Sequence, residues 1–182
     1  MDFYQVINTR RSVRDFSDQR IPQDVLQRVL DAARIAPSGS NRQPWRFVVV
    51  KDPKLRQSLV SACHQQLFIA TAPVVIAACG RDIAFDRGDW MGEHALLVDV
   101  AIAMDHLILA ARAEGLGTCW IGSFSDEQVK GILRVPQDWH AVALTPLGYP
   151  KGDAFVETTD RKPLAEVIHH DTWGKQAGEP GI

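Results

Sequence analysis

The sequence predicts a three-layer α+β sandwich whose central sheet is mixed or largely antiparallel. Helical patterns alternate along the 182 residues with about four apolar, β-like runs. Several connections between these runs are too short for the crossover helix that a parallel strand pair requires. The chain is long enough to bury a sizeable core, and residues 151–182 lose all periodicity. We therefore expect a single domain over residues 1–182, with 151–182 as a C-terminal arm.

The first part of the chain predicts two helices followed by a strand. Asp2 can cap a short helix, with Gln5 three residues later. Pro22 suits the first turn of a second helix, which ends before Pro37. Residues 47–50 are a short β-branched run, which predicts a buried strand. The inward face of the second helix is expected to be an apolar stripe at helical spacing: Val25, Leu26, Val29, Leu30 and Ala33.

The middle of the chain predicts a helix, a strand and then a long helix. Asp52 and Pro53 open the first of these helices, and residues 73–79 form the second strand candidate. Residues 80–91 are polar and irregular. From about residue 92 to 114 the pattern is helical and apolar on nearly every side. Such a helix needs cover all round, and a dimer interface would provide part of it.

The last periodic part predicts two strands with a helix between them. Two glycines, Gly115 and Gly117, end the long helix, and residues 118–121 read as a strand. Ser125 with Gln128 forms a capping box for a helix through residue 133. Residues 139–147 alternate enough to be the fourth strand. Sequence order does not fix the order of the strands in the sheet.

Composition and charge exclude several classes of partner. The formal net charge is −2, so no overall field attracts nucleic acid or an anionic membrane. The three cysteines lie far apart and are expected to be reduced thiols in a cytoplasmic protein. The most apolar window, 95–111, contains Asp99, Asp105 and His106, which fits a buried helix better than a membrane span. We expect neither nucleic acid nor membrane as a partner.

The common motifs of covalent and metal-dependent enzymes are missing from the sequence. No pair of histidines has the H-E-x-x-H spacing, so no metal site is predicted. The chain has no G-x-S-x-G elbow, and no G-x-G-x-x-G or P-loop pattern. The sequence therefore lacks a signature for a hydrolase, a Rossmann site or a P-loop nucleotide site.

Two short segments have compositions that suit ligand binding. Residues 36–45 (Ala-Pro-Ser-Gly-Ser-Asn-Arg-Gln-Pro-Trp) are rich in turn formers, and such a loop offers N–H groups and hydroxyls to a ligand. Arg10, Ser12 and Arg14 lie two residues apart, so in an extended segment their side chains point the same way. Two guanidinium groups around a hydroxyl can grip a monophosphate or carboxylate. Taken alone, each segment also fits a structural turn or a solvated basic turn.

Taken together, the two segments resemble the signature of the nitroreductase family of flavin mononucleotide (FMN) oxidoreductases. Three further segments are similar to that family, so the resemblance covers nearly the whole chain. They are Gln65-Gln66 before Ala-Pro-Val-Val-Ile at 72–76, Gly-Leu-Gly-Thr-Cys-Trp-Ile-Gly at 115–122, and Arg-Lys-Pro-Leu-Ala-Glu at 161–166 followed by Trp173.

The resemblance implies roles for individual residues. Arg10 and Ser12, with Arg161, would hold the phosphate and ribityl chain, while Arg14 and Gln65 would approach the pyrimidine edge of the flavin. Arg14 would also tune the flavin electrostatically, because the reduced ring carries negative charge there. The residues expected to bind FMN are Arg10, Arg11, Ser12, Arg14, Pro37, Ser38, Gly39, Gln65, Trp120, Ile121, Gly122 and Arg161, of which Pro37, Ser38 and Gly39 would come from a partner subunit. The candidates for substrate contact are Asn41, Phe68, Phe85 and Trp90.

The implied function is hydride transfer from NADH or NADPH, through bound FMN, to a nitroaromatic, a quinone or a similar electron-poor small molecule, with ping-pong kinetics. The flavin carries this chemistry, so no catalytic nucleophile is expected. The resemblance also implies a homodimer with FMN sites at the interface and an exchanged C-terminal arm. Thr159 departs from the family pattern, because relatives often carry a second basic phosphate ligand there. The alternatives are another redox task (ene reduction, flavin reduction or reductive dehalogenation) and a flavin-binding protein without turnover.

Overall fold

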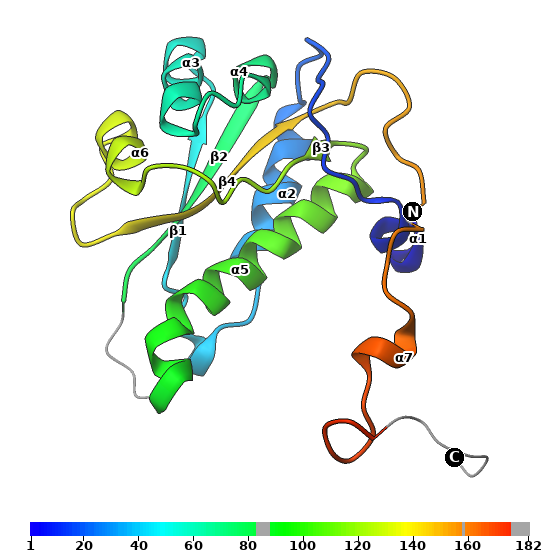
Figure 1. Cartoon of the computed structure of the whole chain (residues 1–182). Coiled ribbons are helices and arrows are strands. Elements are labelled where there is room, and N and C mark those ends of the chain that lie inside the picture. Colours follow the sequence, from blue (N-terminus) through cyan, green and yellow to red (C-terminus); the bar gives the residue numbers. More distant parts are fainter. Residues whose placement is uncertain (83–87, 158, 176–182) are drawn as a thin grey trace.

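The computed structural model describes residues 1–82, 88–157 and 159–175. Its described residues contain one four-stranded sheet, in the order β1-β2-β4-β3, and every neighbouring pair is antiparallel (Figure 1). The strands are β1 (Trp45–Val50), β2 (Val74–Gly80), β3 (Gly117–Thr118) and β4 (His140–Gly148). The prediction of an α+β fold with a largely antiparallel sheet is confirmed.

Helices cover both faces of this sheet, which confirms the predicted three layers (Figure 1). Helices α2 and α5 pack on one face, and α3, α4 and α6 pack on the other. The helices are α1 (Phe3–Thr9), α2 (Gln23–Arg34), α3 (Pro53–Ala62), α4 (Phe68–Thr71), α5 (Asp89–Ala113), α6 (Asp126–Leu133) and α7 (Leu164–Val167), with a 3-10 turn, η1 (Gly39–Asn41).

Side-chain caps fix where several helices begin, as the sequence predicts. Asp2 accepts a hydrogen bond from the backbone N–H of Gln5 at 3.0 Å. Asp52 accepts from the N–H groups of residues 54 and 55 at 2.7 and 3.2 Å. Ser125 accepts from the N–H of Gln128 at 3.3 Å. Each cap satisfies backbone donors that have no partner within the helix.

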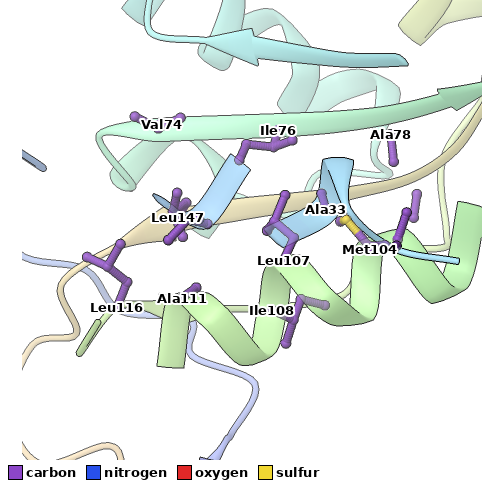
Figure 2. Close-up of a cluster of buried hydrophobic side chains, with 14 of the residues drawn as sticks. Ala33, Val74, Ile76, Ala78, Met104, Leu107, Ile108, Ala111, Leu116 and Leu147 are labelled. Carbon is purple, nitrogen blue, oxygen red and sulfur yellow. The ribbon is translucent and has the colours of Figure 1, made fainter. Parts of the chain in front are cut away.

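Strand β2 runs through the centre of the core and is buried on both faces. Its residues alternate between the two helical layers, since successive side chains point to opposite sides of a sheet. Figure 2 shows the cluster against α5, where Leu107 points toward the strands that carry Ile76 and Leu147. A continuous apolar run in the sequence therefore corresponds to a central strand.

The structure corrects the prediction of a buried strand at residues 47–50. Strand β1 begins two residues earlier, at Trp45, and lies at the edge of the sheet, where β2 is its only partner among the described residues. Phe47, Val48 and Val49 are only half-buried. The β-branched composition indicated a strand correctly, but it could not show that this strand lies at the edge of the sheet.

The predicted strand over residues 118–121 is also wrong in extent. Strand β3 covers only Gly117 and Thr118. The N–H of Cys119 donates to the hydroxyl of Thr145 at 3.1 Å, so it leaves the ladder. Pairing resumes at a single bridge, where Ile121 and Leu144 exchange two backbone hydrogen bonds of 2.8 and 3.0 Å.

Helix α5 confirms the long apolar helix, and it begins at Asp89, three residues earlier than expected. By length and composition alone it could cross a membrane, a test that core helices also pass. In this fold it packs against α2, β2 and β4, but only 39% of its most apolar window is buried. Its other side leaves Met91 and Leu97 exposed, so a wide apolar face lacks cover in one chain. The buried stripe is Asp99, Val100, Ala103, Met104, Leu107, Ile108, Ala111 and Arg112.

The chain after β4 packs against the body at its start. Ala154 and Phe155 pack on a small cluster with Val13 and Phe16. Farther on, the arm runs past α1 and away from the sheet, and α7 lies at some distance from the body (Figure 1). Apolar side chains of this outer part are exposed to solvent, and Trp173 is 92% exposed.

Candidate functional site

The basic segment at residues 10–14 lies along β3 in an extended conformation. Ser12 forms a parallel bridge with Thr118, and the N–H of Val13 donates to the Thr118 carbonyl at 2.8 Å. Val13 points inward and is buried, whereas Ser12 and Arg14 are exposed. The alternation follows from the extended backbone and presents the hydroxyl and the guanidinium on the same side.

A glycine in β3 allows this close approach. A Cβ atom at Gly117 would lie 2.7–2.9 Å from three side-chain atoms of Val13. Real Cβ atoms do not approach other atoms so closely, so a side chain at Gly117 would push the basic segment off the sheet. Gly117 therefore helps to fix the position of Ser12 and Arg14, whereas the long helix ends earlier, at Ala113, and Gly115 follows it with a φ of 77°.

The three arginines of the segment carry charge that the described residues do not neutralise. Arg11 donates to the carbonyl of Arg10 at 2.8 Å, and the Arg14 guanidinium carbon lies 5.8 Å from the centroid of the Phe68 ring. Within the described ranges, no carboxylate pairs with Arg10, Arg11 or Arg14. Unpaired guanidinium groups beside an exposed hydroxyl suit an anionic ligand such as a phosphate monoester.

Two further predicted segments meet near this site. The N–H of Ser125 donates to the Ala62 carbonyl at 2.8 Å. The side-chain amide of Gln66 donates to the carbonyls of Cys63 and Ser123 at 3.0 and 3.2 Å. These bonds join the loop at residues 62–66 to the chain at 121–125.

Gln65 and Trp120, two of the ligand candidates in these segments, are open to solvent, whereas the Ile121 side chain is buried. Gln65 is exposed and has a φ of 62°. Trp120 is 42% exposed, and its Nε1 lies 3.5 Å from the position of a Cβ at Gly122. Of the candidates after Gln65, Phe68 is the one with a contact to the basic segment, through Arg14.

The loop at residues 37–43 lies elsewhere on the same chain. The N–H of Gly39 donates to the buried carboxylate of Asp99 at 3.2 Å, whereas Arg112 donates to Thr9, beside the basic segment, at 3.0 Å. Thirteen residues of α5 separate these contacts, which is about 20 Å along a helix. One chain therefore keeps Pro37, Ser38 and Gly39 apart from Arg10 and Ser12.

This loop has an unusual backbone that its own side chains hold in place. Ser40, Asn41 and Gln43 have φ values of 49°, 54° and 51°, in the left-handed region that favours glycine. Ser38 accepts from the N–H of Gln43 at 2.9 Å, and the Gln43 amide donates to the Asn41 side chain at 3.0 Å. Strained residues fixed by hydrogen bonds are typical of functional loops.

The remaining predicted residues are not gathered at the basic segment. The guanidinium of Arg161 is exposed and donates to the Asp160 carbonyl, and no contact with Arg10 or Ser12 is formed among the described residues. Trp90, at the start of α5, is 65% exposed and stacks on His94 at 4.4 Å. Phe85 lies outside the described residues.

Sequence reasoning assigned no contacts to two buried charged residues on α5, Asp99 and Arg112. Arg112 is 7% exposed; besides its bond to Thr9, its guanidinium carbon lies 3.9 Å from the centroid of the Phe155 ring. It thereby ties the start of the arm and the N-terminal segment to the same helix. Burial lowers the pKa of Arg112, but an arginine remains charged near neutral pH. Asp99 and Arg112 lie at the helical spacing of the buried apolar residues of α5. A charged residue at such a position is the sequence signal that could have revealed their contacts.

Comparisons with known proteins agree with this arrangement. A protein of Archaeoglobus fulgidus, provisionally named as an NADH dehydrogenase/NAD(P)H nitroreductase, is 30% identical over 175 residues, covering 93% of this chain and 97% of its own. Mouse iodotyrosine deiodinase 1 is 28% identical over 195 residues, covering 92% of this chain and 68% of the deiodinase.

A crystal structure and a family model complete the comparison. The structure of a nitroreductase family protein from Clostridium novyi NT superposes with a TM-score of 0.76 at 34% sequence identity, and the match covers all of both chains. The model of the nitroreductase family matches residues 7–93 and 64–149, which together exceed half of the sequence. The expected resemblance is thus confirmed, and the chain belongs to the nitroreductase family.

Proposed function

We propose that this protein is an FMN-dependent oxidoreductase that uses NADH or NADPH to reduce nitroaromatics, quinones or similar electron-poor small molecules by a ping-pong mechanism. Family membership supports an oxidoreductase in general terms. The observation that carries the finer proposal is the basic segment on β3, where Arg10 and Arg14 lack acidic partners among the described residues and flank an exposed Ser12.

The residues of this segment fit the chemistry of FMN. Arg10, Arg11 and Ser12 would hold the phosphate and ribityl chain, and Arg161 would join them if the arm moves or is exchanged. Arg14 and Gln65 would lie at the pyrimidine edge, where a fixed positive charge stabilises a reduced flavin. The backbone and side chains of residues 120–122 would lie against the ring. When bound, FMN would supply the hydride chemistry, and the protein would orient it and leave one face open.

A second copy of the chain would complete each site. Pro37, Ser38 and Gly39 lie far from the basic segment of their own chain and would approach the FMN of the partner. Apolar residues are exposed to solvent on one face of α5 and along the arm. Such exposed apolar surfaces support a homodimer with exchanged arms, because large apolar patches on a soluble protein mark interaction sites.

Aromatic side chains near the open face would contact the substrate. Phe68 is half-buried beside Arg14, and Trp90 is exposed at the start of α5. Together with Asn41 on the strained loop, and Phe85 outside the described residues, they remain our candidates for stacking on an aromatic acceptor or a nicotinamide ring. A cytoplasmic location stays a prediction.

Reductive dehalogenation is the second candidate activity. It is favoured by the similarity to mouse iodotyrosine deiodinase 1, which extends over 92% of this chain. The same bound flavin would serve both activities, so the acceptor decides between them.

The first test of the proposal is the identity of the bound cofactor and its reduction by NADH or NADPH. Protein purified without added flavin should be yellow, and denaturation should release FMN. NADH or NADPH should then bleach the native protein under anaerobic conditions, and a nitroaromatic, a quinone and an iodotyrosine should be compared as oxidants. A yellow protein that neither nicotinamide bleaches would indicate a binding protein without turnover. Release of FAD, or failure to load any flavin, would contradict the proposal.

Substitution of Arg10 tests its proposed role in binding the FMN phosphate. We expect Arg10→Ala to weaken FMN binding roughly 10- to 100-fold, because a hydrogen bond to a charged group contributes about 1.5–3 kcal/mol. The dissociation constant is measured by flavin fluorescence titration of the apoprotein. Arg34→Ala is the matched control, since Arg34 is an exposed arginine paired with Asp31 on α2. Equal FMN affinity in the two variants would remove Arg10 from the site.

Substitution on α5 tests the dimer. Wild-type protein should sediment as a dimer, and Leu97→Asp should shift it toward monomer and lower its FMN content, because a buried unpaired carboxylate is unfavourable at an interface. Leu55→Asp, on an exposed position of α3, is the control and should remain dimeric. A wild-type monomer that retains FMN at micromolar concentration would rule out a site shared by two subunits.

A further inference from the structure

A second basic site lies on the other side of helix α4. A cleft with a volume of about 570 Å³ opens between the chain leading into α2, the start of α3, and residues 70–74. Phe68 of α4 contacts Arg14, whereas Ala70 and Thr71 of the same helix line the cleft. None of the residues assigned above to flavin lines this cleft, so it is a separate feature of the surface.

Positive charge predominates among the residues that line the cleft. Arg20, Lys51 and Arg56 are cationic, and Asp18 is the one carboxylate in the lining. Arg20 forms no ion pair with any described residue. The ammonium of Lys51 donates to the neutral side-chain amide of Gln23 at 3.2 Å. The cleft is therefore left with an excess of two positive charges.

Arg56 is held rigidly at the wall of this cleft. Its Nη1 donates to the carbonyl of Ala70 at 3.1 Å and also to the carbonyl of Ala72. Its Nε is buried and has no hydrogen-bond partner among the described residues. Burial lowers the pKa of Arg56, and the nearby Asp52 opposes this effect, but the Asp52 carboxylate already caps α3. Two backbone carbonyls hold this guanidinium in place, so its charge at the wall of the cleft can act on an anion at little further entropic cost.

We propose that this cleft binds a small organic phosphate monoester. A phosphate monoester carries nearly two negative charges at neutral pH, which matches the excess charge of the lining. The planar guanidinium of Arg56 suits phosphate oxygens, with Arg20 and Lys51 as further donors. Ile21 and Pro73 supply an apolar wall for the organic part. The volume lies within the range of about 300–1,000 Å³ that is usual for small-molecule sites.

The test uses phenyl phosphate as the probe and isothermal titration of the purified protein with its flavin bound. Arg20→Gln and Lys51→Gln should each weaken binding about tenfold, because each removes a hydrogen bond from a charged donor. Lys54→Gln is the matched control, since it removes a charge from α3 outside the cleft and should leave the affinity unchanged. Arg56→Lys keeps the charge but removes the planar fork, and should also weaken binding, with circular dichroism verifying that the variant is folded.

Several outcomes would overturn this assignment. They are the absence of binding to wild-type protein, an equal loss in Lys54→Gln, and a change in the flavin absorption spectrum that parallels saturation, which would place the probe on the flavin. Equal affinity for inorganic phosphate would show that the organic part is not recognised. The result does not depend on the proposed redox activity, because binding is measured directly.

Discussion

Leu107→Ala is expected to lower the free energy of unfolding by about 2–5 kcal/mol, because it removes a large side chain from a packed core and leaves a cavity. The Leu107 side chain has no exposed surface and lies between α5 and the sheet (Figure 2). The loss would be a large part of the roughly 5–15 kcal/mol that stabilises a typical domain. It is measured by urea denaturation at fixed protein and flavin concentrations, because dimerisation and ligand binding both shift apparent stability.

Leu97→Ala is the matched control for this prediction. It removes the same atoms from the same helix, but Leu97 is 50% exposed in the single chain. Its effect on the folding of one chain should be small, and any loss of stability should depend on protein concentration if Leu97 lies at a dimer interface. Equal, concentration-independent losses in the two variants would contradict the burial pattern of α5.

Gly117→Ala is expected to destabilise the protein by about 1–3 kcal/mol, as overpacking does in cores, and to weaken FMN binding at the same time. The new Cβ would lie within 2.9 Å of Val13 and would displace the segment that carries Ser12 and Arg14. Both effects should arise from one displacement, so thermal unfolding and FMN affinity are measured on the same samples.

A second substitution separates this displacement from a general effect of alanine. Val13→Gly removes all three clashing atoms, so the double variant Gly117→Ala with Val13→Gly should recover flavin affinity relative to Gly117→Ala alone. Gly131→Ala is the control for glycine replacement, because a Cβ there has no neighbour within 4 Å, and alanine favours the helix by up to about 1 kcal/mol. If FMN affinity stays normal in Gly117→Ala, the segment does not depend on its contact with β3.

Local chemistry made much of the fold predictable. Asp2, Asp52 and Ser125 mark helix starts because each places a side-chain oxygen where backbone N–H groups need a partner. The apolar run of β2 indicated a strand buried on both faces, and α5 was evident from its length and composition.

The contacts between distant segments were not predictable. The end of β3 depends on the hydroxyl of Thr145, which lies 26 residues away and draws the Cys119 N–H out of the ladder. The position of β1 at the edge of the sheet depends on which strands pair, and its own residues do not encode that choice. Local patterns specify elements, whereas pairing is decided by the packing of the whole chain.

The candidate site likewise has a part that could be predicted from the sequence and a part that could not. The sequence identified the basic segment and the loop at residues 37–43 from their composition and their resemblance to a family. It could not show that Asp99 and Arg112 anchor these two segments about 20 Å apart on one helix. Because of that separation, a site that combines the two segments would need a second chain, as the resemblance to the family had already implied.

The place of β4 in the sheet has a consequence for biosynthesis. β4 lies between β2 and β3, yet it is the last of the four strands in the sequence, so the sheet cannot close until residue 148 has left the ribosome. Until then α5, which ends at Ala113, lacks one of the strands that cover its buried stripe. Nascent chains arrested between these two points should therefore expose the α5 stripe and recruit chaperones that recognise apolar segments.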